Sequence, residues 1–361
     1  MSIEDWGWDS YFEAQWHSED REAMLRARVI SQQRGLWRVR GEFEESWAEP
    51  SGKLRLDAES GGDWPAVGDW AAISRDGSNG RAQMHGVLRR RSSFSRKEAG
   101  KRMGEQVIAA NVDTAFIVCG LDGDFKPRRI ERYLAQCWDS GVKPVLVLNK
   151  ADVGADLPEK VRTAERAGVG CTVLVTSARS GRGLGELREA IAPCRTHVLL
   201  GSSGVGKSTL VNALLNAHVQ STQPTRESDS RGRHTTSARE LFVLPGGGLL
   251  IDTPGLRELQ LWAEEDSIAQ AFPEIAALAA HCRFRDCRHN GEPGCAVAAA
   301  LESGALDPAR FENRSKLLRE QAFLRRKVDA GAQHAEKQRI KVVSRRIRQR
   351  YLQGEKDPRT G

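Results

Sequence analysis

The chain has 361 residues, 39% of them hydrophobic and 29% charged, which is typical of a globular protein with two or three domains. Its net charge of +7 and its pI of about 9.1 are by themselves only a weak indication of a nucleic-acid partner. No apolar run approaches the ~20 residues of a membrane span, and the acidic N-terminus is not a secretory signal, so we expect a cytoplasmic protein that binds no membrane.

Residues 1–26 are polar and aromatic, predict one short helix at most, and are treated as an N-terminal extension. Short alternating runs broken by glycine follow through residues 27–100. The runs typical of strands are Arg28–Ser31, Leu36–Arg40, Lys53–Leu56, Asp69–Ile73 and Met84–Arg91. They predict a small antiparallel β-barrel, with an oligonucleotide-binding barrel (OB-fold) as the first candidate, although the pattern also fits a β-sandwich or an SH3-like barrel.

Residues 101–262 alternate between strands and helices, which predicts an α/β domain with a mostly parallel sheet and helices on both faces. The expected strands are Val112–Cys119, Pro144–Leu148, Cys171–Val175, Thr196–Leu200, Leu241–Leu244 and Leu249–Ile251. Expected helices include Ile130–Trp138 and Leu184–Ala192. Residues 263–361 have no further strand pattern and are predicted to form an α-helical C-terminal domain.

A phosphate-binding loop (P-loop) follows the strand Thr196–Leu200 and matches the Gly-x4-Gly-Lys-Ser pattern at every fixed position. Backbone N–H groups of such a loop surround the phosphates, and the helix that follows adds partial positive charge. Lys207 is expected to reach the β- and γ-phosphates and to act in catalysis, and Ser208 to bind Mg²⁺. The predicted phosphate-binding residues are Gly201, Ser202, Ser203, Gly204, Val205, Gly206, Lys207, Ser208 and Thr209.

Two further motifs follow strands at the same predicted edge of the sheet, where ligands of such sheets bind. In the first, Asn149, Lys150 and Asp152 form an Asn-Lys-x-Asp sequence. The Asp152 carboxylate can accept hydrogen bonds from guanine N1–H and the exocyclic amine, and adenine does not present these donors. In the second, the backbone of Ser177 and Ala178 can donate to guanine O6. Together with the P-loop, these motifs predict that the nucleotide is GTP or GDP.

The γ-phosphate side of the site is predicted from Asp252-Thr-Pro-Gly255. Asp252 would hold the hydration shell of Mg²⁺, and the Gly255 N–H would contact the γ-phosphate. In the polar loop 221–239, Thr235 or Thr236 could close over Mg²⁺. A leucine follows Gly255 and cannot orient water, so His234 is the candidate catalytic residue. The alternative is that His234 only packs against the loop or faces solvent.

The order of these motifs is reversed relative to an ordinary GTPase, in which the P-loop precedes Asn-Lys-x-Asp. The same sheet forms if the chain is circularly permuted, because the geometry of the site depends on where strands lie in space and not on their order along the chain. We therefore predict a circularly permuted P-loop GTPase domain.

Three cysteines and two histidines lie between His281 and Cys295. Cys282, Cys287, His289 and Cys295 form a Cys₃His set of the kind that binds structural zinc, so we expect one Zn²⁺ per chain. We do not include His281 in the ligand set. It is adjacent to Cys282, and in most local geometries its side chain would point away from the metal. The alternative is a set of reduced thiols without metal.

Positive charge is concentrated at the C-terminal end. Residues 310–361 contain 16 Lys and Arg against six Asp and Glu, a net charge of +10, so the rest of the chain is slightly acidic. This local excess favours RNA binding more than the total charge does, although a solvated helix face would also explain it.

Taken together, these motifs resemble the ribosome small-subunit-dependent GTPase A family (RsgA, also called YjeQ). The resemblance rests on the permuted motif order, on residues 232–236, on Leu261-Trp262 and on the Cys/His spacing. It implies a multidomain protein with an OB-fold barrel, a permuted GTPase domain and a zinc-binding helical domain. It also implies a role in late maturation of the small ribosomal subunit, with rRNA as partner and hydrolysis stimulated by the subunit.

We expect the protein to act as a monomer. A hypothesis of a different class is a GTP-regulated RNA-binding protein that acts on mRNA or tRNA rather than on the ribosome. The barrel and the basic tail fit both hypotheses.

Overall fold

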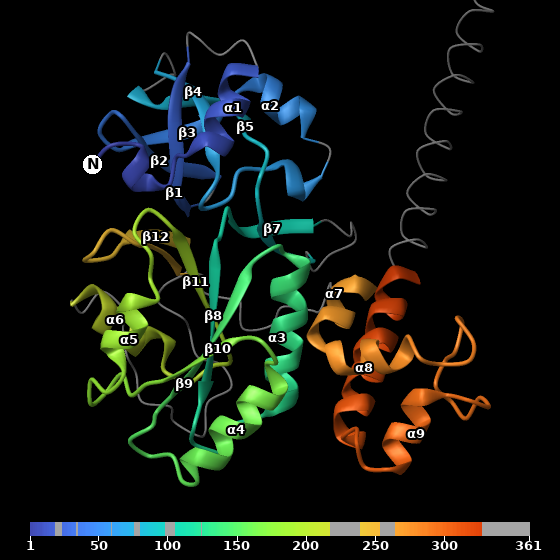
Figure 1. The fold of residues 1–361 in the computed structure, drawn as a ribbon. Coiled ribbons are helices and arrows are strands. Elements are labelled where there is room, and N and C mark those ends of the chain that lie inside the picture. Colours follow the sequence, from blue (N-terminus) through green and yellow to red (C-terminus); the bar gives the residue numbers. More distant parts are fainter. Residues whose placement is uncertain are drawn as a thin grey trace, which may run out of the picture.

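The fold is described from a computed structural model of the chain. The structure describes residues 1–18, 24–33, 35–58, 60–75, 80–97, 105–123, 125–216, 239–252 and 264–326. A β-barrel lies at one end of the molecule, an α/β domain in the middle, and a helical region beside the α/β domain (Figure 1). Among the described residues, no helix combines the length and the hydropathy needed to cross a membrane.

The N-terminal extension is packed into the protein. It contains a 3₁₀ turn at Glu4–Trp6 and helix α1 (Ser10–Ser18). Its three tryptophans are buried, and Trp8 meets Trp70 of the barrel edge-on with ring centroids 4.8 Å apart. The exposed fraction of Phe12 is only 1%. This aromatic packing explains why a short polar segment is rich in tryptophan.

Five strands form the barrel: β1 (Leu25–Gln33), β2 (Leu36–Gly41), β3 (Ser46–Pro50), β4 (Trp70–Ser74) and β5 (Ala82–Val87). They are hydrogen-bonded in the order β1-β2-β3-β5-β4, and β4 also pairs with β1, which closes the ring. Alternate side chains such as Val29, Val39, Ile73 and Met84 fill the interior. A closed five-stranded ring is not a sandwich, and it confirms the predicted OB-fold barrel.

One predicted strand was wrong and one strand was missed. Lys53–Leu56 lies in helix α2 (Gly52–Asp57), while the strand is Ser46–Pro50. The helix begins because the Ser51 side chain accepts a hydrogen bond from the Leu54 N–H at 3.2 Å. Leu54 is then buried whereas Leu56 is 85% exposed, so the apolar alternation of this run does not reflect a strand.

The central domain contains the sheet order β10-β9-β8-β11-β13-β12. Its strands are β8 (Thr114–Gly120), β9 (Lys143–Asn149), β10 (Thr172–Val175), β11 (Thr196–Leu200), β12 (Arg239–Val243) and β13 (Leu249–Asp252). All neighbouring pairs are parallel except β12–β13. The six predicted strands are therefore confirmed within a few residues. A two-stranded ribbon of β6 (Ser93–Lys97) and β7 (Glu105–Ala110) was not predicted.

Helices cover both faces of this sheet. Helices α3 (Pro127–Asp139) and α4 (Leu157–Ala167) pack with the side of the strands that carries Ile117 and Leu146. Helices α5 (Leu184–Glu189) and α6 (Lys207–Leu215) pack with the side that carries Phe116 and Val147. Successive strand residues thus enter opposite cores, as a doubly covered sheet requires.

The barrel and the α/β domain share one continuous sheet. Strand β1 pairs antiparallel with β12, with Ser31 opposite Glu240 and Gln32 opposite Arg239. Arg38 of β2 also forms an ion pair with Glu240. No local pattern predicts this pairing, because the two strands lie about 200 residues apart and each is short.

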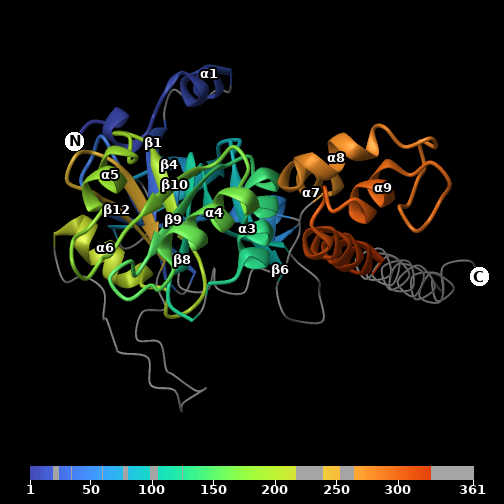
Figure 2. The ribbon, with the colours of Figure 1, turned by 60° about the horizontal axis from the view of Figure 1, so that its bottom comes forward.

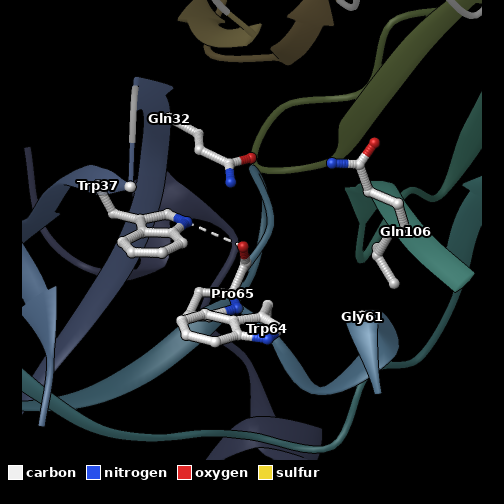
Figure 3. Close-up of a pocket in the computed structure, with 8 residues that line it drawn as sticks. Gln32, Trp37, Gly61, Trp64, Pro65 and Gln106 are labelled. Atoms are coloured by element: carbon white, nitrogen blue, oxygen red, sulfur yellow. Dashed lines mark hydrogen bonds between the residues drawn. The ribbon is translucent and has the colours of Figure 1, made fainter. Parts of the chain in front are cut away.

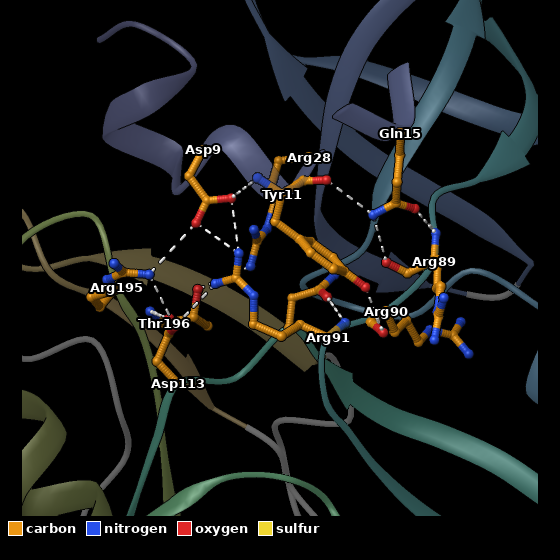
Figure 4. A network of polar contacts seen from close by, with 11 residues as sticks. Asp9, Tyr11, Gln15, Arg28, Arg89, Arg90, Arg91, Asp113, Arg195 and Thr196 are labelled. Carbon is orange, nitrogen blue, oxygen red and sulfur yellow. Dashed lines mark hydrogen bonds and ion pairs between the residues drawn. The ribbon is translucent and has the colours of Figure 1, made fainter. Parts of the chain in front are cut away.

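A network of ion pairs binds the N-terminal extension to the same junction (Figure 4). The Asp9 carboxylate receives two hydrogen bonds from Arg91, at 2.7 and 2.8 Å. Arg91 and Arg195 also lie 3.5 and 3.4 Å from Asp113. Asp113 in turn accepts the Thr196 N–H at 2.8 Å, at the start of β11. The extension therefore contacts the strand that leads into the P-loop.

Arg28 lies at the centre of this junction and is only 1% exposed. Its guanidinium donates to Thr196 Oγ1 at 2.9 Å and lies 5.3 Å from the centroid of the Trp70 ring. Burial lowers the pKa of Arg28 to about 10, so it remains charged at neutral pH. Arg28 thus links Trp70 of the barrel to Thr196 of the α/β domain, and these contacts fix the relative position of the two domains.

The C-terminal region is helical and packs beside α3, as two views agree (Figures 1 and 2). It contains α7 (Glu265–Ala271), α8 (Pro273–Ala279), α9 (Ala296–Glu302) and a helix over residues 308–326. Arg310 of the last helix bonds Glu131 of α3 at 2.8 Å and lies 5.0 Å from the Phe272 ring centroid. This confirms the predicted α-helical C-terminal domain, while residues 327–361 lie outside the described part of the chain.

Candidate nucleotide-binding site and metal centre

The P-loop joins β11 to α6 at the carboxyl edge of the sheet. Lys207, the first residue of α6, donates from Nζ to the backbone oxygens of Gly201 and Ser202, each at 2.6 Å. The ammonium group therefore lies across the loop itself, where phosphate oxygens could replace these carbonyls as its partners. All nine predicted P-loop residues fall on this strand–loop–helix turn.

Two glycines of the loop are required by its backbone. Gly201 has φ of 146°, and a Cβ there would lie 2.4 Å from the Val118 oxygen. Gly206 has φ of 95°, and a Cβ there would lie 2.4 Å from the side-chain nitrogen of Asn149. Any other residue would separate the loop from β8 or from the Asn-Lys-x-Asp motif.

Asn149 joins the three predicted nucleotide motifs through one buried amide. Its Nδ2 donates to the Val205 oxygen of the P-loop at 2.9 Å. Its Oδ1 accepts from the Thr176 hydroxyl at 3.2 Å and from the Ala178 N–H at 3.1 Å. The exposed fraction of Asn149 is 2%, so these bonds are shielded from water. Sequence analysis assigned Asn149 to the site but did not predict that it organises the loops.

The predicted guanine contacts lie side by side. Ser177 is fully buried and donates from its hydroxyl to Asp152 Oδ1 at 2.6 Å. This hydrogen bond is the main reason why the pKa of Asp152 is lowered, so the side chain remains an ionised acceptor. Lys150 has a positive φ of 67°, and its Nζ lies 2.5 Å from Asp122.

Two contacts at the site were missed by sequence reasoning. Arg129 of α3 donates from Nη1 to the Ser202 hydroxyl of the P-loop at 2.6 Å. Asp122, on the loop after β8, pairs with Lys150 as described above. Arg129 and Ser202 are 73 residues apart, and Arg129 belongs to no recognisable local pattern, so only the fold brings them together.

The predicted Mg²⁺ side is described in part. Ser208 is the second residue of α6, and Asp252 is the last residue of β13. Because β13 runs parallel to β11, with Val198 opposite Ile251, Asp252 reaches the same edge of the sheet as the P-loop. His234, Thr235, Thr236 and Gly255 lie outside the described residues.

The Cys₃His set is brought together between α8 and α9. The ligand atoms of Cys282, Cys287, His289 and Cys295 all lie within 4.8 Å of one another. His289 Nδ1 is 3.6 Å from the Cys282 sulfur and 3.4 Å from that of Cys295, and these two sulfurs are 3.9 Å apart. Ligands of tetrahedral zinc, with bonds of about 2.0–2.3 Å, lie roughly 3.5–3.8 Å apart. The donors and their spacing therefore fit zinc.

The backbone around this cluster supports the same conclusion. The Ala298 N–H at the start of α9 donates to the Cys295 sulfur at 3.3 Å, which fixes the position of this sulfur beside the other three ligands. His289 has a positive φ of 61°, which turns its ring back toward the cysteines. His281 is exposed and is not among the four clustered ligands, as expected.

Comparisons with known proteins agree with this geometry. The sequence model of the RsgA GTPase family matches residues 87–262. The chain is 45% identical to "Small ribosomal subunit biogenesis GTPase RsgA" of Opitutus terrae, over 95% of this chain and 96% of the relative. It is 42% identical to the protein of the same name from Syntrophotalea carbinolica, over 96% of both chains.

Two solved structures share the fold. YjeQ from Thermotoga maritima is 27% identical and superimposes with a TM-score of 0.62, covering 83% of this chain and 99% of that chain. YloQ, described as a circularly permuted GTPase, is 22% identical with a TM-score of 0.59 and covers 84% of this chain and 97% of that chain. The second likeness supports the fold alone.

Proposed function

This chain belongs to the RsgA GTPase family and is a GTP hydrolase, and we propose that it acts in biogenesis of the small ribosomal subunit. The observation that carries the proposal is the single buried amide of Asn149, which bonds both the P-loop and the Ser177–Ala178 loop. These hydrogen bonds support the proposal that phosphate binding and base selection take place in one site. This organisation favours a GTPase over a protein that binds RNA without nucleotide.

We propose the following roles for the site residues. Lys207 and the backbone of residues 201–209 bind the phosphates, and Asp152 accepts from the guanine edge. Lys150 packs its stem on the purine, and Ser177 and Ala178 bind near O6. Ser208, Asp252 and Thr236 hold Mg²⁺, which would neutralise charge developing on the phosphates. Gly255 contacts the γ-phosphate.

Hydrolysis is proposed to require the subunit. We propose that His234, with Thr235 beside it, orients the attacking water. Both residues belong to a polar loop that has no large apolar side chains to pack it against the protein, so His234 would rarely be in position and the free protein should hydrolyse GTP slowly. In comparable GTPases, a partner that supplies or positions a missing catalytic group accelerates GTP hydrolysis ~10³–10⁵-fold. The small subunit and its rRNA are thus the proposed partners of a cytoplasmic, monomeric protein.

The proposal is tested by sedimentation and turnover together. Protein bound to a non-hydrolysable GTP analogue should sediment with small subunits, and protein bound to GDP should sediment less. GTP turnover should rise by orders of magnitude when small subunits are added, and should rise far less for His234→Ala. Sedimentation with mRNA or tRNA but not with subunits would favour the alternative, a GTP-regulated RNA-binding protein.

We propose that the Cys₃His cluster holds one structural zinc. Four protein ligands leave no open position, so the metal would stabilise the loop between α8 and α9 rather than take part in hydrolysis. Cys287→Ser should abolish zinc in metal analysis and lower the unfolding temperature of the C-terminal region. Cys194→Ser, at an unclustered thiol, is the matched control and should retain the metal. Zinc-free wild-type protein purified under reducing conditions would contradict the assignment.

A further inference from the structure

A pocket of about 270 Å³ opens where the barrel meets the α/β domain (Figure 3). Its walls come from the end of β1, the β1–β2 turn, the segment Gly61–Pro65 and the start of β7. At ~30 Å³ for each molecule of liquid water, the space equals about nine waters. That volume admits one planar ring system but not a folded ligand. None of its lining residues belongs to the nucleotide or metal sites described above.

Two side-chain amides face this pocket, and their orientation is set by Arg239. The guanidinium of Arg239 donates to Gln32 Oε1 at 3.4 Å and to Gln106 Oε1 at 3.2 Å. Arginine has no acceptor, so both amide oxygens must turn toward it, which settles the otherwise ambiguous amide assignment. The two NH₂ groups then point away from Arg239. In Figure 3 the amides of Gln32 and Gln106 face each other across the pocket.

An aromatic surface forms the opposite wall. Trp64 is half-buried, and its ring stacks on the fully buried Trp37 with an interplanar angle of 10°. Trp37 is itself fixed by a hydrogen bond from Nε1 to the Pro65 oxygen at 2.8 Å. Trp64 therefore presents a rigid apolar face next to two hydrogen-bond donors.

We propose that this pocket binds a single unstacked nucleobase. A base offers a planar ring for Trp64 and, on its edge, ring nitrogens or carbonyl oxygens that accept from the two amides. The pocket selects the base rather than phosphate, because its polar groups are neutral amides and the nearby guanidinium is directed at their oxygens. Single-stranded RNA is the expected source, and a free nucleotide is the other.

This inference deepens the proposed function, since the subunit is rich in RNA, but it is tested without subunits or hydrolysis. Protein loaded with GDP, so that the nucleotide site is filled, is titrated into a labelled, unstructured RNA tetranucleotide while anisotropy is recorded. Uridine and adenosine monophosphates serve as competitors. A tetranucleotide of the same charge that carries abasic sugars reports binding through phosphates alone.

The deciding variants are Gln32→Glu and Gln106→Glu. A glutamate keeps the oxygen that Arg239 requires, so the fold is retained, but it replaces the NH₂ donor with a second acceptor. The control is Gln33→Glu, which adds the same charge one residue along β1, on the exposed opposite face. Trp64→Leu removes the aromatic face, and thermal unfolding verifies that each variant folds.

We expect Gln32→Glu, Gln106→Glu and Trp64→Leu each to weaken RNA binding at least tenfold, and Gln33→Glu to change it less than twofold. The difference between normal and abasic RNA should persist in high salt, since neutral amides and stacking carry it, whereas phosphate binding should fade. Equal binding of abasic and normal RNA, or equal losses for Gln106→Glu and Gln33→Glu, would overturn the proposal. Competition by monophosphates as strong as by RNA would identify a free nucleotide as the ligand and overturn RNA as the source.

Discussion

Asn149 shows how one side chain can set the geometry of a whole site. Its amide has both donors and acceptors, and the donor meets the P-loop while the oxygen meets the loop after β10. Gly206 must be glycine because the Asn149 amide lies where a Cβ would be. The P-loop and the proposed base-binding loop are therefore matched in shape as well as in hydrogen bonding.

The first prediction concerns the choice of base. Asp152→Asn exchanges one carboxylate acceptor for an amide donor, which leaves a guanine donor without its partner. We expect GDP affinity to fall by about 1–3 kcal/mol, or roughly 5–150-fold, with xanthosine diphosphate binding gained. Calorimetric titration of GDP, xanthosine diphosphate and ADP measures this. Asp156→Asn, at an exposed residue of the same loop, is the control, and equal losses in both variants would contradict the assignment.

The second prediction concerns Arg129, whose guanidinium donates to the Ser202 hydroxyl at 2.6 Å. Arg129→Ala removes this link between α3 and the P-loop. Hydrogen bonds to charged groups contribute about 1.5–3 kcal/mol, so GDP affinity should fall about tenfold while the preference for GDP over ADP is retained.

Arg128→Ala is the matched control, because that side chain is 55% exposed and forms a surface pair with Glu312 at 3.6 Å. Nucleotide titrations and thermal unfolding of both variants are compared. If Arg129→Ala binds GDP as tightly as Arg128→Ala does, the contact has no role in the site.

How much of the site the sequence reveals depends on the distance between partners. Residues 201–209 and 149–152 could be proposed as a nucleotide site from the sequence, because each motif is local and its backbone geometry requires particular residues. Ser202 with Arg129, and Lys150 with Asp122, depend on how β8, α3 and β11 lie in the sheet. Nothing near Arg129 in the sequence distinguishes it from the exposed arginine beside it.

At the scale of elements, α3 connects the nucleotide site to the C-terminal helices. One side of it reaches the P-loop through Arg129. Glu131, which is 4% exposed, receives Arg310 at 2.8 Å, and Arg132 pairs with Glu320 at 2.8 Å. Burial raises the pKa of the Glu131 carboxyl, against the opposing effects of Asn313 and Arg310.

The third prediction follows from this buried pair. Arg310→Ala leaves the Glu131 carboxylate buried with its cation lost, which typically costs about 3–5 kcal/mol of unfolding free energy. Because the folded-state pKa of Glu131 is raised, the folded protein takes up a proton there and stability falls as pH rises through that pKa. The loss should therefore be larger at about pH 8 than at about pH 5 in urea unfolding.

The double variant with Glu131→Gln tests the cause. A neutral amide needs no cation and can still accept from Asn313, so part of the lost stability should return. A loss that is independent of pH and not restored by Glu131→Gln would mean that Arg310 acts through its packing on Phe272 instead.

Local patterns predicted most elements of the fold but not all. Strands β8 to β13 were found because long apolar runs alternate with helices. Lys53–Leu56 was misassigned because alternation of two leucines fits a strand, whereas the Ser51 cap that starts a helix is a single hydrogen bond. The β6–β7 ribbon was missed because both strands are short, β6 is mostly polar, and the predicted domain boundary at residues 100–101 falls between them.

At the scale of the whole molecule, the barrel and the GTPase domain form one sheet and share a core. The buried cluster that contains Trp8 and Trp70 also contains Val198 and Ile251 beside the P-loop. A shared core of this kind couples the unfolding of the two domains, since unfolding either one would expose apolar surface of the other.

The fourth prediction uses the tryptophans as reporters of this coupling. Seven of the nine lie before residue 71, so intrinsic fluorescence follows the extension and the barrel. GDP at about 100 times its dissociation constant stabilises the nucleotide site by ~2.7 kcal/mol, and the fluorescence transition should move up by roughly 5 °C. ADP is the control. A fluorescence transition that GDP leaves in place, while circular dichroism of the helices shifts, would show that the two parts unfold independently.

The pairing of β1 with β12 has a consequence for biosynthesis. A ribosome completes β1 about 200 residues before it releases β12, so the growing chain must carry an incomplete sheet through most of its synthesis. Until β12 is available, the edge of β1 at Ser31 and Gln32 has no strand to pair with. An open strand edge of this kind can form hydrogen bonds with other chains and promote aggregation. Translation speed and chaperone supply should therefore affect the yield of this protein more than that of a GTPase whose barrel closes on itself alone.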